Sequence, residues 1–313
     1  MTPLVSIITV NFRQAAITMD LLDSLRAITY PAYEVLLVDN GALPDEFPDY
    51  EAHLPEVRVI RSSENLGFAG GNNLAIQEAR GQYILLLNND TVVPPNFLEP
   101  LVELMETKPD SGIVSPKIYY HEDPRRLQYA GQGQLNFVTG RGQDAAKGQL
   151  DEGQFETVRT TDFTHGACML IRREVLEQIG LLTEDYFLYY EELDFCLRTR
   201  ATGWQLYYTP QSYIHHRESV SVGKASPLKT HYMFRNRWLL VRRFGTASTY
   251  WLFFLYYVGI GVPKHLFRHM LRGEWTHVKA LVRGLAWNFR HGRQAPVIPS
   301  FTSVHQPSTS TTS

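Results

Sequence analysis

Strand and helix patterns alternate over the first 120 or so residues, and this alternation constrains the fold more than any other feature of the sequence. Short apolar runs occur at "LVSIITV" (4–10), "EVLLVD" (34–39), "VRVI" (57–60) and "YILLL" (83–87). Helical spacing follows the first run, and the segments 69–79 and 96–109 also read as helices. Such alternation predicts an α/β fold with a mainly parallel sheet flanked by helices.

The second part of the sequence has longer and more polar connections. A strand is expected at 112–120, and a strand followed by a short helix at 166–180. A helix at 191–204 precedes a strand pair at 205–216. After Pro227 the segment "LKTHYMFRNRWLLVRRF" (228–244) predicts a long helix that is both basic and aromatic.

Charge is strongly segregated along the chain. Residues 1–223 contain 17 Lys and Arg against 31 Asp and Glu, whereas residues 224–313 contain 13 Lys and Arg and a single acid, Glu274. A basic stretch of this kind attracts phosphate, either in nucleic acid or at a membrane surface. Bulky apolar residues are interleaved with these cations, so the pattern favours a membrane surface over a nucleic-acid partner.

The apolar run "STYWLFFLYYVGIGVP" (248–263) lies within this basic part. Its uninterrupted core is roughly a dozen residues, against the ~20 that a helix needs to cross a bilayer. We therefore expect residues 224–293 to form amphipathic helices in the interface of an anionic membrane. Packing within the protein, contacts in an oligomer and a membrane span remain alternatives. The Ser-, Thr- and Pro-rich tail 294–313 is expected to be disordered.

The cysteines and the N-terminus bear on the compartment. Cys168 and Cys196 are the only cysteines, too few for a disulfide framework or a zinc site. The run "VSIITV" is too short for a signal peptide and has no basic region before it. We expect a cytoplasmic protein, peripheral on the inner face of the cell membrane.

Polar residues follow three of the expected strands at the point where each strand ends. Asn11 follows the first, Asp39 and Asn40 follow the second, and the triplet 88–90 ("NND") follows "YILLL". An Asn or Asp at one strand end is common in turns for purely local reasons. In a parallel sheet, however, these ends share one edge, where ligands bind, so three together indicate a site.

Two common nucleotide-binding motifs are absent. No glycine fingerprint follows the first strand, and the glycines in "NLGFAGGNN" (65–73) do not spell GxGxxG. There is also no GxxxxGK[ST] motif. These glycines still leave backbone N–H groups bare near a helix start, where phosphate oxygens bind well.

Several segments resemble family 2 glycosyltransferases of GT-A fold, in particular the bacterial rhamnosyltransferase and galactofuranosyltransferase-like branch. The segments "VSIITVNF", "LLVDNG", "NLGFAGGNN", "LLLNNDT", "GACMLIRRE", "YYEELDFCLR" and "HYMFRNRWLL" occur in the order seen in that family. The resemblance covers about residues 4–245. It implies a GT-A domain at 1–223, with a nucleotide-sugar half at about 1–118 and an acceptor half at about 119–223.

The resemblance implies a set of donor and metal ligands. The base and ribose of a sugar nucleotide would be held by Thr9, Asn11 and Asp39, and the nucleotide side lined by Gly70, Gly71, Asn72 and Asn89. Asp90 matches the last acid of the family's DxD motif, although Asn88 stands where the first acid often occurs. One carboxylate with phosphate oxygens and water can still hold Mg²⁺ or Mn²⁺. His216, which fits the register better than His215, would complete the metal shell.

The resemblance places the catalytic base in "EELD". An acceptor hydroxyl that replaces a nucleotide diphosphate with inversion needs one carboxylate to take its proton. Neighbours on a helix point about 100° apart, so one of the two glutamates should face the acceptor. We expect Glu192, with Glu191 as the alternative; Asp194 either contacts substrate or pairs with Arg198 at i, i+4 spacing. Three residues would flank the acceptor, Asp162, Gly166 and Cys168, while Arg235 and Asn236 would either close over the diphosphate or brace the site.

Three functions are compatible with these features. The expected one is an inverting, metal-dependent glycosyltransferase that moves a sugar from a nucleotide diphosphate to a glycan acceptor, lipid-linked, in cell-surface polysaccharide synthesis. A sugar-nucleotide nucleotidyltransferase would need a glycine-rich and basic loop after the first strand, where "NFRQAA" offers only Arg13. A non-catalytic glycan-binding or assembly protein at the membrane is the third.

Overall fold

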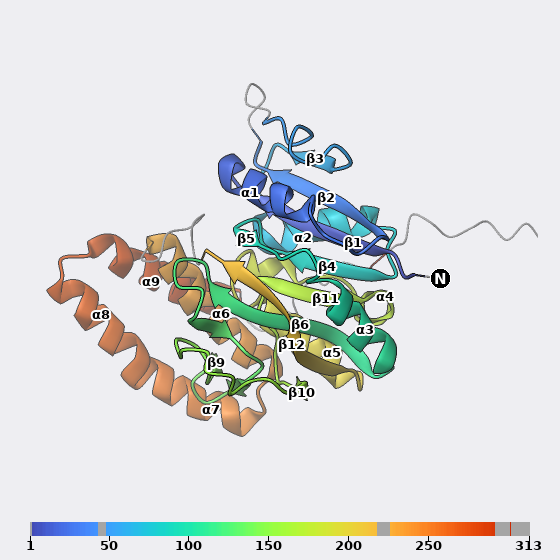
Figure 1. The fold of residues 1–313 in the computed structure, drawn as a ribbon. Helices are drawn as coiled ribbons and strands as arrows, with labels where there is room; N and C mark the ends of the chain where they lie inside the picture. The colour runs from blue at the N-terminus through green and yellow to red at the C-terminus, as the bar shows by residue number, and fades with distance from the viewer. Residues whose placement is uncertain (1, 43–47, 218–225, 292–300, 302–313) are drawn as a thin grey trace, which may run out of the picture.

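The computed structural model describes residues 2–42, 48–217, 226–291 and 301. A mixed sheet of ten strands runs through the body, with the order β10-β12-β6-β11-β4-β1-β2-β3, while β5 pairs with β12 and β7 pairs with β6 (Figure 1). A separate hairpin joins β8 to β9. The strands are β1 (Val5–Asn11), β2 (Tyr33–Asn40), β3 (Arg58–Ser62), β4 (Tyr83–Leu87), β5 (Thr91–Val92), β6 (Ser111–Tyr120), β7 (Leu127–Tyr129), β8 (Gly133–Asn136), β9 (Arg141–Asp144), β10 (Arg159–Thr160), β11 (Cys168–Arg172) and β12 (Gln205–His216).

Helices cover both faces of this sheet. They are α1 (Ala15–Leu25), α2 (Gly67–Glu78), α3 (Glu99–Thr107), α4 (Arg173–Ile179), α5 (Glu191–Ala201), α6 (Pro227–Phe244), α7 (Ala247–Tyr256), α8 (Val262–Leu271) and α9 (Trp275–Arg290), with a 3₁₀ turn at Glu184–Tyr186 and a π-helical turn at Tyr257–Gly261.

The strand residues alternate between two cores. Ile7 and Leu85 pack with α1 and α3 on one face, whereas Ile8 and Leu86 pack with α2, α4 and α5 on the other. Successive side chains of a strand point to opposite faces, so a strand that is covered on both sides is apolar throughout. This is why "YILLL" reads as an unbroken apolar run.

The sheet changes character along its length. β3, β2, β1 and β4 are parallel, as the alternation of strands and helices predicts. β11 then runs antiparallel to both β4 and β6, and β6 is parallel to β12. The sheet is therefore mixed. The expected strand pair at 205–216 is one strand, whose register shifts between Thr209 and Tyr213, beside Pro210, which has no backbone N–H to donate.

The C-terminal helices form an arm at the side of the body (Figure 1). α6 belongs to both parts, because Leu239 and Leu240 pack into the sheet's core while Trp238 and Val241 pack with α7 and α9. α7, the π-helical turn and α8 follow one another without a break, and α9 returns against α6. In the described part of the chain, none of the helices combines the length and the hydropathy that crossing a bilayer requires.

Candidate active site

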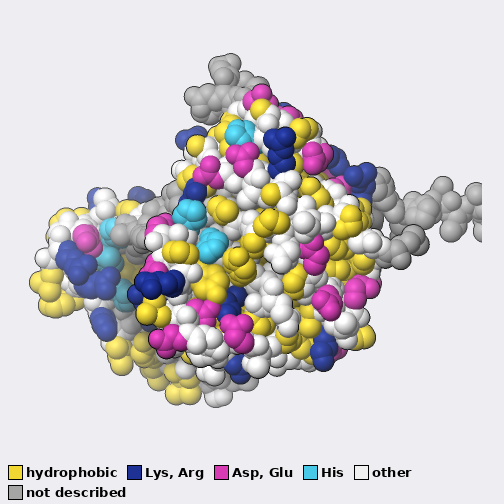
Figure 2. Space-filling model, viewed as in Figure 1, with side chains coloured by type: hydrophobic (Ala, Val, Ile, Leu, Met, Phe, Trp, Pro, Cys, Tyr) yellow, Lys and Arg dark blue, Asp and Glu magenta, His cyan; other side chains and the backbone are white. Residues whose placement is uncertain are grey.

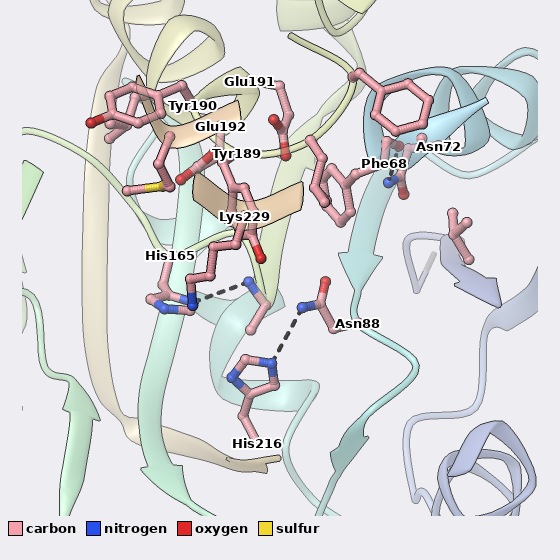
Figure 3. Close-up of a pocket in the computed structure, with 18 of the residues that line it drawn as sticks. Phe68, Asn72, Asn88, His165, Tyr189, Tyr190, Glu191, Glu192, His216 and Lys229 are labelled. Atoms are coloured by element: carbon pink, nitrogen blue, oxygen red, sulfur yellow. Dashed lines mark hydrogen bonds between the residues drawn. The ribbon is translucent and has the colours of Figure 1, made fainter. Parts of the chain in front are cut away.

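A cavity of about 650 Å³ lies at the carboxyl ends of β1, β2 and β4. Its other walls are the segment 187–190, the beginnings of α5 and α6, and the β8–β9 hairpin. In Figure 3, Glu191 and Glu192 lie at one end of this space and Asn88 and His216 at the other. Seven of the residues expected at the site line it: Asn72, Asn89, Asp90, Gly166, Glu191, Glu192 and His216.

Asp90 and His216 form one pair of polar groups in the cavity. They come together because β5, which begins one residue after Asp90, is antiparallel to the end of β12. The distance from Asp90 Oδ1 to His216 Nε2 is 3.0 Å, and both side chains are nearly buried. His216 Nδ1 lies 2.6 Å from Gln128 Oε1. An amide oxygen can only accept, so Nδ1 donates, while Nε2 faces Asp90 Oδ1 and also lies 3.3 Å from Asn88 Nδ2.

This pair fits a divalent cation. Asp90 Oδ1 is buried and has no hydrogen-bond partner among the described residues. It faces Nε2 of His216, whose other ring nitrogen is fixed by Gln128 in the way that metal-binding histidines usually are. The described residues contain no cluster of three or more His, Cys, Asp or Glu that could hold a metal. Two protein ligands would therefore leave most of the shell to diphosphate oxygens and water.

Glu191 and Glu192 occupy the first turn of α5. Burial, together with the negative charge of Glu192, raises the pKa of Glu191 well above its usual value, and Glu191 Oε2 has no hydrogen-bond partner in the described structure. Burial also raises the pKa of Glu192, but backbone N–H groups at the helix start lower it in part. Glu192 is thus the carboxyl group that ionises more readily.

The segment leading into α5 has an unusual backbone. Phe187, Tyr189 and Tyr190 all have positive φ, at 59°, 68° and 79°. Residues other than glycine adopt this conformation at a cost, and such strain gathers at functional sites when the surroundings enforce it. Here it turns the chain so that two consecutive carboxyl groups enter the cavity.

Arg235 and Asn236 of α6 hold this segment. Asn236 Nδ2 donates to the carbonyl oxygens of Tyr186, Leu188 and Tyr189 at 2.7–2.9 Å. Arg235 Nη2 donates to the carbonyl oxygens of Asp185 and Tyr186. Arg235 is absent from the cavity wall. Of the two roles expected for these residues, bracing the site is the one that the contacts match.

Thr9, Asn11 and Asp39 lie beneath the cavity and do not line it. Asn11 Nδ2 donates to Asp39 Oδ1 at 2.9 Å and to the Tyr50 hydroxyl at 3.0 Å, while Thr18 donates to Asn11 Oδ1. All three predicted residues are nearly buried. The wall at this end is formed instead by Phe12, Asn40, Asn65 and Phe68.

Gly70 and Gly71 serve packing. A Cβ on Gly71 would lie 2.8 Å from Val10, and one on Gly70 would lie 2.9 Å from Leu66. Neither glycine lines the cavity, whereas the neighbouring Asn72 does. The small size of Gly71 lets α2 approach β1 closely, and that of Gly70 leaves room for Leu66 at the start of α2.

The structure does not bring Asp194, Asp162 or Cys168 to the cavity. Asp194 is buried and accepts hydrogen bonds from Thr183, Tyr186, Arg198 and Arg243, so the expected i, i+4 pair with Arg198 is present. Asp162 pairs with Arg200 at 3.0 Å. Cys168 is buried at the start of β11, while Gly166, two residues earlier, lies against Glu192.

Several cavity residues have no signal in the sequence motifs. Lys229 extends into the space between the two ends in Figure 3, with its Nζ 5.6 Å from the ring centre of Tyr189. His165 is packed edge-on against His216, with 5.7 Å between ring centres. Arg141 and Arg237 come from β9 and α6. From the sequence alone, a basic residue in a polar loop or on a basic helix that faces the cavity cannot be told from one that faces solvent.

Comparison with known proteins assigns the family. The model described as glycosyl transferase family 2 matches residues 6–180. The chain belongs to this family. Its mixed sheet, with the cavity at the carboxyl ends of β1, β2 and β4, is the GT-A fold.

The relatives differ in length and description. An uncharacterized protein of Sinorhizobium fredii is 31% identical over 71% of this chain and 25% of its own length. An O-antigen biosynthesis protein of Myxococcus xanthus is 32% identical over 70% of this chain and 18% of its own. The chain therefore spans a quarter or less of these two proteins.

Two further proteins match most of both chains. The N-acetylglucosaminyl-diphospho-decaprenol L-rhamnosyltransferase of Mycobacterium tuberculosis is 25% identical over 74% of this chain and 82% of its own. A mannosyltransferase of Pyrobaculum calidifontis, solved in complex with GDP-Man and Mn²⁺, has a TM-score of 0.57 at 18% identity and covers 93% of this chain and 76% of its own.

Proposed function

We propose that this chain is an inverting, metal-dependent glycosyltransferase that moves a rhamnose- or galactofuranose-like sugar from a nucleotide diphosphate to a lipid-linked glycan acceptor. The observation that carries the proposal is that the Asp90–His216 pair and the Glu191–Glu192 pair face the same cavity. One pair suits a metal-bound diphosphate and the other suits the incoming hydroxyl.

The donor would lie along the edge of β1, β2 and β4. Asn65 and Asn72 offer amide groups to the nucleotide, and Phe68 offers a ring face, while the amide of Asn40 is held by Asn65, Leu66 and Gly67. The diphosphate would lie toward Asp90 and His216, which would hold Mg²⁺ or Mn²⁺. A cation bound there would neutralise the charge that grows on the departing diphosphate. The mannosyltransferase solved with GDP-Man and Mn²⁺ supports this part of the proposal.

Glu192 would act as the base. It ionises more readily than Glu191, and it can then take the proton of an acceptor hydroxyl as that oxygen attacks the sugar. Glu191, whose pKa is raised further, would stay protonated and donate a hydrogen bond. A single displacement from the face opposite the diphosphate inverts the anomeric carbon.

The acceptor is proposed to be lipid-linked, and the arm to rest on an anionic membrane at its cytoplasmic face. The arm exposes large apolar side chains and Lys and Arg residues together, as the edge of the molecule at the left of Figure 2 shows. The apolar ones include Trp251, Leu252, Leu255, Ile260, Phe267, Met270 and Leu271. Exposed Lys264, Arg268 and Arg272 lie on the same run of helix. Such a combination favours an anionic lipid surface, and the relative named for a diphospho-decaprenol acceptor supports a lipid substrate.

A donor panel tests the proposal. Purified protein would be incubated with uridine, deoxythymidine and guanosine diphosphate sugars and Mg²⁺ or Mn²⁺, and nucleotide release measured. We expect release with one donor, its loss on chelation, and a fall of at least about 10²-fold in the Asp90→Ala variant. Binding without turnover that is indifferent to Glu192→Gln would favour the non-catalytic alternative. Formation of a nucleotide sugar from a nucleoside triphosphate would favour the nucleotidyltransferase.

A further inference from the structure

A group of basic residues lies where the cavity meets the arm. We call it the basic cluster: Arg141 on β9, Arg237 on α6, and His265 and Arg268 on α8. Gly140 lets the β8–β9 hairpin lie close to α6 and α7, because a Cβ on this glycine would lie 2.7 Å from Arg237 Cγ and 2.9 Å from the Phe253 ring. The hairpin that carries Arg141 is therefore packed directly on α6 and α7. Arg141 and Arg237 both line the cavity.

The two arginines of the cavity wall have no carboxylate within ion-pair distance among the described residues. Arg141 Nε is buried without a hydrogen-bond partner in the described part of the chain. Arg237 is nearly buried, donates from Nε to the Tyr190 hydroxyl at 3.2 Å, and lies over the rings of Phe234 and Tyr257. By contrast, Arg198 and Arg243 share the buried carboxylate of Asp194.

Aromatic rings alone can hold a buried arginine, so Arg237 by itself would need no ligand. Several like charges at one place are different, because they repel one another. Burial, with the charges of Arg268, Arg237 and Arg141, lowers the pKa of His265 to about 4. Arg141 and Arg237 thus line the cavity without a carboxylate partner among the described residues, an arrangement that an anion would stabilise.

The position of the cluster indicates which anion. The donor diphosphate belongs with Asp90 and His216, at the other end of the cavity. The cluster lies at the carboxylate end of the cavity. Arg237 donates a hydrogen bond to the hydroxyl of Tyr190, the residue before Glu191, and this hydroxyl donates to the Gly140 carbonyl at 3.0 Å. Glu192 and Arg237 line the same cavity, so one acceptor could contact both. The same cluster adjoins the apolar arm through His265, whose ring is 5.1 Å from that of Phe234.

We propose that Arg141 and Arg237 form a subsite for the phosphate or diphosphate group of a lipid-linked sugar acceptor. This rests on the glycosyltransferase function proposed above and names the chemistry of its acceptor. The guanidinium groups hold the acceptor's phosphate oxygens, the sugar next to them presents its hydroxyl to Glu192, and the lipid chain leaves along the arm.

The test measures binding of farnesyl diphosphate to the full chain by calorimetry, with the donor site saturated by a nucleoside diphosphate and Mg²⁺. Arg141→Gln is the main variant, because Arg141 is only partly buried. We expect its dissociation constant to rise about tenfold or more, as for loss of a charged hydrogen bond. Arg26→Gln, an exposed arginine on the far side of the sheet, removes the same charge and should change the constant less than about twofold.

Further binding measurements distinguish the lipid chain from the diphosphate as the source of affinity. Farnesol and inorganic pyrophosphate should both bind more weakly than farnesyl diphosphate, and Arg237→Lys, checked for folding by circular dichroism, should weaken farnesyl diphosphate as Arg141→Gln does. Equal affinity of wild type and Arg141→Gln overturns the proposal. So does equal affinity for pyrophosphate, or an equal loss of nucleoside diphosphate affinity in Arg141→Gln. If no donor is turned over in the donor panel, the proposed glycosyltransferase function is contradicted. The farnesyl diphosphate measurement still tests the subsite, because it does not depend on turnover.

Discussion

Two adjacent glutamates with unequal surroundings are the main feature at the scale of residues. Both sit in the first turn of α5, yet burial affects Glu191 more strongly, and Glu192 receives more help from backbone N–H groups. Two carboxyl groups in one cavity avoid being ionised together, so their environments separate an acid from a base. This division favours Glu192 for the proposed proton-accepting role.

A pH profile follows from the raised pKa of Glu192. The base works as a carboxylate, so turnover should fall as the pH drops, with a midpoint above the usual value of 4.5. We expect Glu192→Gln to lower kcat by about 10²–10⁴-fold and to remove this acid limb. Asp90→Asn serves as the control: it should slow the reaction and keep the limb. A limb that persists in Glu192→Gln would assign the base to another group.

Glu191 should make stability depend on pH. A carboxyl group whose pKa is raised by folding holds its proton more tightly in the folded state, so stability falls as the pH rises above about 4.5. Glu191→Gln removes this loss. We expect the variant to gain unfolding free energy at pH 7 and little at pH 4, because only above the unfolded-state pKa does the wild type lose stability. Urea titrations of this variant and of the exposed Glu51→Gln would show it; equal gains at both pH values would contradict it.

The sequence motifs located some residues of the site better than others. Asp90, His216 and the two glutamates line the cavity because each follows or ends a strand or begins a helix whose position the α/β pattern determines. Asp39 and Asn11 end strands too, but the Tyr50 hydroxyl and Thr18 draw them into a buried network. Such partners come from distant segments, and a pattern of apolar residues does not reveal them.

The segment 187–190 is the element on which the site depends most. Its positive φ values are maintained by contacts from two sides, Asn236 on α6 and the start of α2, where Phe68 N donates to Phe187 O at 2.7 Å. Gly67 permits that approach, since a Cβ there would lie 2.3 Å from Phe187 O. A glycine in "NLGFAGGNN" that suggests phosphate binding from sequence thus also shapes the catalytic turn.

Gly67→Ala should disturb this segment more than an ordinary glycine replacement does. Gly67 and Gly203 both have positive φ, at 70° and 96°, but only Gly67 would clash, because nothing lies within 4 Å of a Cβ on Gly203. We expect Gly203→Ala to cost about 1 kcal/mol of unfolding free energy with kcat unchanged. Gly67→Ala should cost more and reduce kcat at least about tenfold. Equal effects of the two variants on kcat would show that the contact with Phe187 is unimportant.

At the scale of the whole molecule, the acidic body and the basic arm are built around different cores. The α/β pattern anticipates the body, and the charge segregation anticipates an arm of helices. The way α9 packs on α6 was not predictable, because it depends on Gly284, whose Cβ would lie 2.7 Å from His231 O. A lone glycine inside a basic helix carries no sign of such a contact.

The arm should bind anionic vesicles through its exposed apolar side chains. Leu255 and Leu271 are 67% and 72% exposed, so a glutamate at either position should leave the fold intact. We expect each variant to reduce partition onto phosphatidylglycerol vesicles about tenfold, from lost apolar burial and added repulsion. Val158→Glu, at an exposed position outside the arm, is the matched control. Sedimentation that is equal for all three variants and wild type would rule out this docking face.

The contact between α9 and α6 links the outermost helix to the chemistry. Asn288 on α9 donates to the Arg235 carbonyl at 2.9 Å, and the next residue, Asn236, restrains the turn before the two glutamates. Removing α9 would therefore weaken the support of the segment 187–190, which precedes the two glutamates. A chain that lacks α9 should therefore have a lower kcat even with a water-soluble alcohol as acceptor, which binds without a membrane.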